Sequence, residues 1–89
     1  MEVLVFLYGH RHGHDISVYV SEELAVAEGA RIARQWWSQA RDRDASLPGR
    51  PPEEDLKAFE LYFEAMRGFE YCEMFVCPVE GVGATLVER

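Results

Sequence analysis

The residues best able to do chemistry in this chain are three histidines that alternate with other residues, His10, His12 and His14. They are the only histidines among the 89 residues, and Asp15 follows them directly. Imidazole is the commonest metal ligand in proteins and the side chain that titrates near neutral pH. The cluster is therefore consistent with three roles: a metal site, a pH-responsive contact or an ordinary polar turn.

Two mostly apolar runs rich in β-branched and aromatic residues flank this cluster and predict the strands that carry it. We expect these strands at residues 2–10 and 14–21. Glycine accepts a positive φ, so a two-residue turn at residues 12–13 suits a hairpin. In this register Phe6 lies opposite Tyr19.

Such a hairpin makes a metal site hard to assemble. It directs His10 to one face, leaves His12 at the tip and sets His14 opposite Arg11. Three imidazoles on one metal ion would then need a distorted loop or a second chain. We favour the polar turn, with Asp15 as the partner of His10, and keep metal ligation by the three histidines as the alternative.

The string at residues 10–15 resembles the His-x-His-x-Asp-His signature of the metallo-β-lactamase superfamily of hydrolases and nucleases. That resemblance would imply a metal-dependent hydrolase with a four-layer fold. The last two residues of the signature are exchanged here, and the chain has neither the further histidines nor the length of that fold. No serine or cysteine lies in a context typical of a nucleophile. We therefore expect no enzyme and no cofactor.

The rest of the chain predicts two helices and a third strand. Ser21 is a suitable N-cap for a helix that runs to about Arg41. A linker rich in charge and proline follows, and a second helix starts at Pro52 and ends before Gly68. A strand at residues 69–79 comes next, and the tail from residue 81 can add a fourth.

The element order β-β-α-α-β indicates a single α+β domain over residues 1–89. We expect a mainly antiparallel sheet of three strands, or four with the tail, and two helices packed on one face of it. The stripe of the first helix consists largely of small residues, which lets that helix approach the sheet closely: Ala25, Gly29, Ala30 and Ala33.

The first strand is apolar on both faces, so one of its faces has no obvious cover. We expect the helices to cover the aliphatic side, which carries Val3, Val5, Leu7, Ile16, Val18 and Val20. The aromatic side then faces outward, and exposed patches of this kind mark interfaces. The predicted protein-binding residues on it are Leu4, Phe6, Tyr8 and Tyr19.

The charge of the chain narrows the choice of partner. The formal net charge is −7, and residues 53–80 hold eight acids against two basic residues. Such a surface repels phosphate backbones, so we expect no direct nucleic-acid binding, whereas a basic protein would suit it. Glu53, Glu60 and Glu64 of the second helix are the predicted contacts for such a protein.

Targeting and cysteine usage indicate a cytoplasmic protein. No apolar run approaches the roughly 18 residues that span a bilayer, and no basic stretch precedes the first apolar run. Cys72 and Cys77 lie five apart in one predicted strand and point to opposite faces, so we expect both to be free.

These observations predict a non-enzymatic, acidic protein-binding module that uses the outer sheet face and the acidic helix. Its partner would be a second copy, giving a homodimer, or a basic target. In size and charge alone the chain is similar to phage-encoded inhibitors of nucleic-acid-handling host proteins. The alternative is a metal-binding protein that uses His10, His12 and His14.

Overall fold

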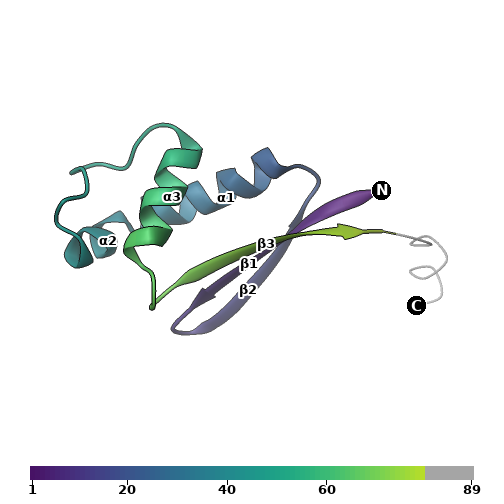
Figure 1. Cartoon of the computed structure of the whole chain (residues 1–89), viewed down its shortest axis with the longest axis horizontal. Coiled ribbons are helices and arrows are strands. Elements are labelled where there is room, and N and C mark those ends of the chain that lie inside the picture. The colour runs from purple at the N-terminus through teal and green to yellow at the C-terminus, as the bar shows by residue number, and fades with distance from the viewer. Residues whose placement is uncertain (80–89) are drawn as a thin grey trace.

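The computed structural model describes residues 1–79, in which a β-hairpin is followed by three helices and a third strand (Figure 1). The elements are β1 (Glu2–His10), β2 (Gly13–Tyr19), α1 (Glu22–Gln35), α2 (Trp37–Arg43), α3 (Asp55–Ala65) and β3 (Tyr71–Pro78). The α+β class is confirmed. The expected fourth strand lies outside the described residues.

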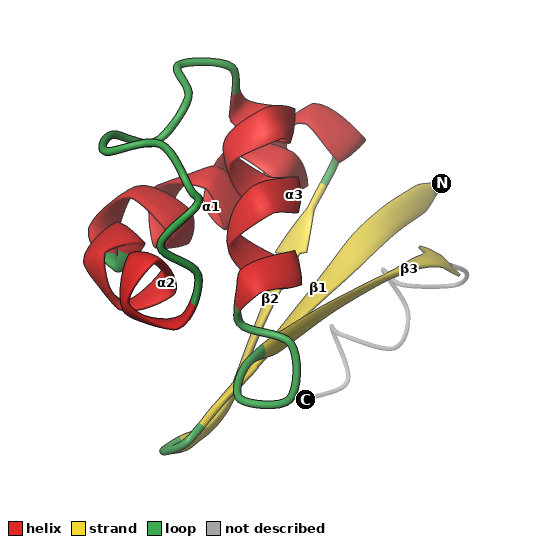
Figure 2. Cartoon of the chain, turned by 60° about the vertical axis from the view of Figure 1, so that its left-hand side comes forward, coloured by secondary structure: helices red, strands yellow, loops and turns green. Residues whose placement is uncertain are grey.

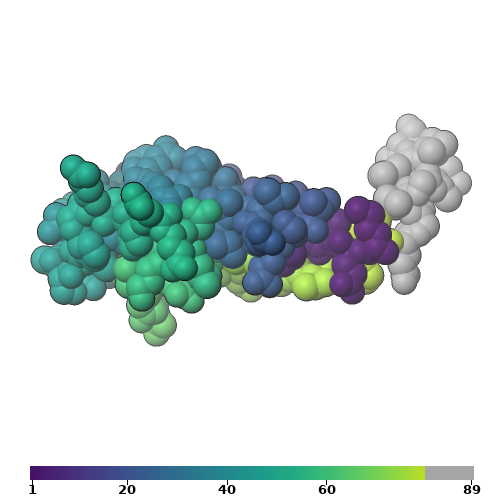
Figure 3. All heavy atoms as spheres, turned by 90° about the horizontal axis from the view of Figure 1, so that it is seen from above, coloured from purple at the N-terminus to yellow at the C-terminus, as the bar shows by residue number. Residues whose placement is uncertain are grey.

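The sheet has the strand order β2-β1-β3, and both pairings are antiparallel. All three helices lie on one side of it, so the molecule has two layers (Figure 2). Its Cα extents of 51 × 27 × 16 Å describe a long slab. Seen from the helix side, the strands continue past α1 at the end where β1 begins and β3 finishes (Figure 3).

The hairpin register differs from the prediction by two residues. Phe6 pairs with Ser17, and His10 pairs with Gly13, so residues 11–12 form the turn. Gly13 has φ +127° and is the first residue of β2. The glycine with the positive φ therefore directly follows the two turn residues, whereas the prediction placed it in the turn. A shift of two residues keeps each side chain on its predicted face, because side chains alternate with a period of two.

The first predicted helix is broken into α1 and α2. Ser21 caps α1 as expected, since its hydroxyl accepts a hydrogen bond from the Leu24 N–H at 3.3 Å. The helix ends at Trp36, which has φ −114° and is 39% exposed. Trp37 is buried, and its indole N–H donates to the carbonyl of Pro48 at 2.9 Å. Only the second of the two tryptophans is a core residue.

The second predicted helix, α3, begins at Asp55, three residues later than expected. Arg34 of α1 holds this start in place, because it forms an ion pair with Asp55 at 2.8 Å and donates to the carbonyl of Glu53 at 2.7 Å. Gly68 turns the chain toward β3 with φ +90°. The glycine therefore acts where the sequence indicated a helix end.

The core lies between the helices and the aromatic side of the sheet, so the expected orientation of the sheet is wrong. Phe6 is 1% exposed and Tyr8 is also buried. The small residues of α1 explain this outcome: they leave room that aliphatic side chains would fill less completely. The Phe6 ring meets Phe59 of α3 and Tyr19 of β2 edge to face, at centroid distances of 6.4 and 6.3 Å.

A substitution at Gly29 tests the fit between the small residues of α1 and the aromatic rings that pack against them. An added Cβ there would overlap the ring of Phe59. Gly29→Ala therefore costs about 1–3 kcal/mol of overpacking, more than the roughly 0.5–1 kcal/mol that alanine gains in a helix. We expect a lower free energy of unfolding in urea denaturation followed by circular dichroism. Gly49→Ala is the control, because a Cβ there meets nothing within 4 Å. A Gly29→Ala protein as stable as wild type would contradict the packing.

Candidate functional site

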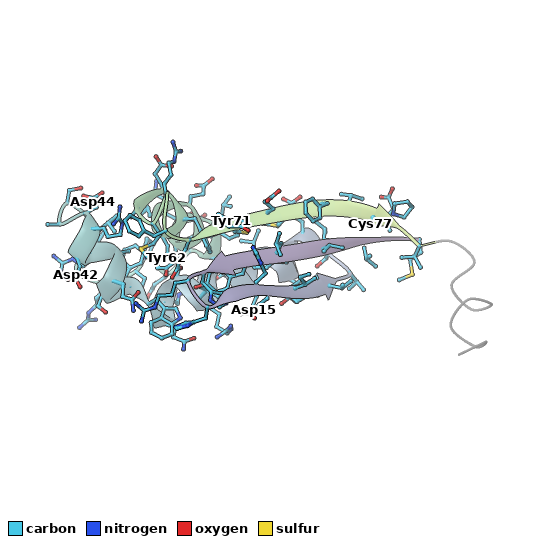
Figure 4. The ribbon with its side chains drawn as sticks, turned by 90° about the horizontal axis from the view of Figure 1, so that it is seen from below. Asp15, Asp42, Asp44, Tyr62, Tyr71 and Cys77 are labelled. Atoms are coloured by element: carbon cyan, nitrogen blue, oxygen red, sulfur yellow. The ribbon has the colours of Figure 1, made fainter. Side chains whose placement is uncertain are left out.

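The side of the sheet turned away from the helices is an uncovered apolar surface, which we call the open face. Side chains alternate along a strand. Phe6 and Tyr8 point toward the helices, so the odd-numbered residues of β1 and their register partners on β2 and β3 point to the opposite side. It comprises Val3, Val5, Leu7 and Gly9 of β1, His14, Ile16 and Val18 of β2, and Tyr71, Glu73, Phe75 and Cys77 of β3. Figure 4 looks onto this side of the molecule.

The edge strands of the open face hold its most exposed apolar side chains. Ile16 is 68% exposed and Val18 58%, and Val20, which directly follows β2, is 68% exposed. Phe75 on the other edge is also exposed, while the valines and Leu7 of the central strand are half-buried between their neighbours. Of the aliphatic residues that we expected in the core, Ile16, Val18 and Val20 are thus exposed to solvent.

One end of the open face is closed by Tyr71. Its ring lies over Gly9 on the central strand, where a Cβ would overlap it. Its hydroxyl reaches across β1 to hydrogen-bond His14 Nε2 on the far strand. Glycine is required at position 9 because it has no side chain, which lets the Tyr71 ring pack directly against the backbone of β1.

The predicted metal ligands do not converge. His14 lies on the open face, whereas His10 lies on the helix side and His12 at the exposed turn. Within residues 1–79, no group of three or more histidine, cysteine or acidic side chains is placed to hold a metal ion. The structure therefore separates the three histidines instead of assembling them.

Both ring nitrogens of His10 are already used. The His12 backbone N–H donates to Nδ1 at 3.2 Å, so Nδ1 is unprotonated and Nε2–H donates to Asp15 at 3.0 Å. The predicted pairing with Asp15 is confirmed. An imidazole held in this way has no free lone pair for a metal or for a substrate proton.

A cleft of about 540 Å³ opens on the helix side, between the hairpin tip and α1 and α2. Its volume lies within the range of small-molecule sites. Phe6, Tyr8 and Ile32 form its apolar floor, and Trp36 and Phe69 are among its exposed walls.

Several of the charged side chains around the cleft already have partners within the protein. Glu28 holds Arg31 through two hydrogen bonds of 2.8 and 2.7 Å. Arg43 lies over the Phe69 ring, 3.5 Å from its centroid, and donates to the carbonyl of Ala65. His10 is also engaged, so the cleft has the shape of a ligand site but several of its ionisable side chains already have partners.

Glu70 joins the sheet to α3 at the edge of this cleft. Its Oε1 accepts hydrogen bonds from the hydroxyls of Tyr8 at 2.9 Å and Tyr62 at 2.6 Å. Burial, reinforced by the adjacent Glu70 carboxylate, raises the pKa of both tyrosines far above their ordinary value. The three side chains therefore form a structural clamp rather than a proton-transfer chain.

The remaining predicted contact residues lie in the helix layer. Glu53 precedes α3, and Glu60 and Glu64 on α3 are exposed. Glu64 forms an ion pair with Arg67 at 2.7 Å. These carboxylates belong to the layer that covers the opposite side of the sheet from Val18, so a single flat partner would not contact both surfaces (Figure 2).

The expected aromatic binding surface is not available. Phe6 and Tyr8 are buried beneath the helices, and Tyr19 and Leu4 are half-buried on the same side. Strand β1 is apolar on both faces, as predicted, but the helices cover its aromatic face and not the aliphatic face that we expected them to cover. The signal for the buried side was the stripe of small residues in α1, because such a stripe leaves room that aromatic rings fill better than branched aliphatic side chains do.

Comparison of the chain with family models, curated proteins and solved structures found no match. Within the described residues, no helix has the length and apolar character needed to cross a membrane. The surfaces of the molecule are therefore the basis for inferring what it does.

The tyrosine clamp predicts a pH dependence of stability. Because the pKa of Tyr8 and of Tyr62 is raised in the folded protein, their contribution is complete below about pH 10, where unfolded tyrosines ionise, and is lost above it. We expect each tyrosine to lower the free energy of unfolding by about 1.4 kcal/mol per pH unit above that point. Urea denaturation between about pH 9 and about pH 11 measures the slope. A Tyr8→Phe/Tyr62→Phe variant that keeps the wild-type slope would contradict the assignment.

Proposed function

We propose that this protein is a non-enzymatic protein-binding module whose contact surface is the open face. The observation that carries the proposal is that Ile16, Val18 and Val20 are exposed along one edge of the sheet, beside a central strand whose side chains are half-buried. Contiguous apolar surface of this kind is typical of interaction sites in proteins. The free cysteines are consistent with a reducing, cytoplasmic compartment.

The size of the hydrophobic gain supports a partner for this surface. Fully burying one aliphatic side chain is worth about 1.5–3 kcal/mol. Ile16 and Val18 of β2, Val20 directly after it and Phe75 of β3 are each still 42–68% exposed. Covering them together therefore supplies more than this amount before the cost of association is subtracted. The face is also built on a sheet, which holds these side chains in place and lowers the entropy lost on binding.

Other classes of partner fit the open face less well. It carries no lysine or arginine, which a phosphate backbone or an anionic lipid surface would require. The separation of the three histidines gives metal binding no support. A basic protein can still meet Glu60 and Glu64, but it would do so in the helix layer and apart from the hydrophobic anchor.

Site-specific photocrosslinking tests this proposal. A benzophenone amino acid replaces Val18 on the open face or, as a control of similar exposure, Leu56 on α3. In an extract of the cells that make the protein, we expect discrete protein adducts from position 18 only. Excess unlabelled wild type should suppress them, while excess Ile16→Glu should not, because a buried carboxylate without a partner is costly.

An adduct with a second copy counts as support in the same way as an adduct with another protein. The same adducts from both positions, or suppression by the Ile16→Glu chain, would contradict the open face as a specific contact surface. Circular dichroism of each variant confirms that it is folded.

A further inference from the structure

The open face has few charges, and their arrangement indicates its occupant. Among its residues only Glu73 carries a carboxylate and only His14 an imidazole, and none is a lysine or arginine. No ion pair involves Glu73 within residues 1–79. A partner with an apolar surface and one group that pairs with this carboxylate would therefore complement the open face.

We infer that the occupant is a second copy of this chain, packed sheet against sheet around a two-fold axis that runs along β1. The inference rests on the proposed function and names its partner. A second copy presents an equally apolar surface, and a two-fold axis makes every contact occur twice. Charged residues are depleted at the centre of stable interfaces, as they are here.

The strand order determines what each charged group meets. Because β1 is central, an axis along it sets β1 over β1 and places β3 of one copy over β2 of the other. Residues paired across the three strands form a row: Glu73 lies in the row of Leu7, and His14 lies in the next row on the same face, that of Gly9. Rows on one face are about 7 Å apart, and packed sheets are rotated by about 30°, so the carboxylate comes within reach of the imidazole of the other copy. The Nε2 of His14 is bonded to the Tyr71 hydroxyl of its own chain, so Nδ1 is the ring nitrogen that meets this carboxylate.

The other face-to-face arrangement is disfavoured by the same charges. An axis across the strands would place β3 over β3, so that the two Glu73 carboxylates would share one edge of the interface with no imidazole beside them. With the axis along β1, each copy instead contributes one acid and one imidazole at opposite edges. Of these two orientations, only the one with the axis along β1 brings the acid of one copy to the edge that holds the imidazole of the other.

Sedimentation equilibrium of the full chain over a range of concentrations tests the inference. We expect a wild-type dimer and a dissociation constant raised about a hundredfold or more by Ile16→Glu, because the substitution occurs twice in each dimer. Leu56→Glu introduces the same charge at an exposed apolar residue of α3 and should leave the dimer intact. Circular dichroism shows whether each variant is folded.

A mixing experiment tests the orientation. His14→Glu sets two acids against each other in its own dimer, and Glu73→Lys sets lysine against histidine, so each chain alone should associate weakly. Mixed in equal amounts, they can pair Glu with Lys at one edge and His with Glu73 at the other. We expect the mixture to form heterodimers with at least tenfold tighter association than the His14→Glu chain alone.

Three outcomes overturn the inference. They are a wild type that stays monomeric up to about 1 mM, a dimer whose dissociation constant is unchanged by Ile16→Glu, and a mixture of the two charge variants that associates no more tightly than the His14→Glu chain alone. They are distinguishable from failure of the proposed function. A monomeric wild type that still gives specific adducts from position 18 refutes the second copy and leaves the open face as a binding surface. A monomer without such adducts refutes both.

Discussion

The structure depends on a match in size between the small residues of α1 and the aromatic rings of the sheet and α3. Ala25, Gly29, Ala30 and Ala33 are all buried in α1, and none of them fills the layer between helix and sheet alone. Phe6 and Phe59 supply the missing volume, and an interior must be filled to crystal-like density. The match decides which side of the sheet is covered, and therefore which side is left for a partner.

Burying the aromatic side also required a partner for each buried hydroxyl. Tyr8 and Tyr62 both find it in Glu70, which lies just before β3. A buried hydroxyl without a hydrogen bond costs on the order of 1–3 kcal/mol, so this carboxylate selects the helix-covered face as much as the rings do. An aliphatic core would have needed no such group, and Glu70 would then have been one more solvated acid.

The sequence was sufficient for elements whose signals are local. The strands, the Ser21 cap and the role of Gly68 follow from residue types within a few positions of each other. The side of the sheet that is buried is not a local property, because both faces of β1 are apolar and the choice depends on α1 and α3 together. The pairing of Tyr8 with Glu70 spans 62 residues and could not be predicted for the same reason.

The separation of charge from apolar surface removes an objection to the proposed association of an acidic chain through its sheet. The exposed acids of α3, such as Glu60 and Glu64, belong to the helix layer, whereas the open face has a single carboxylate. Neighbouring layers lie about 10 Å apart, so two chains packed sheet to sheet hold their helix layers about 30 Å apart. The Debye length is about 8 Å at physiological ionic strength, and repulsion between the helix layers is therefore screened. A net charge of −7 would thus keep the helix side solvated without opposing the proposed contact through the sheet.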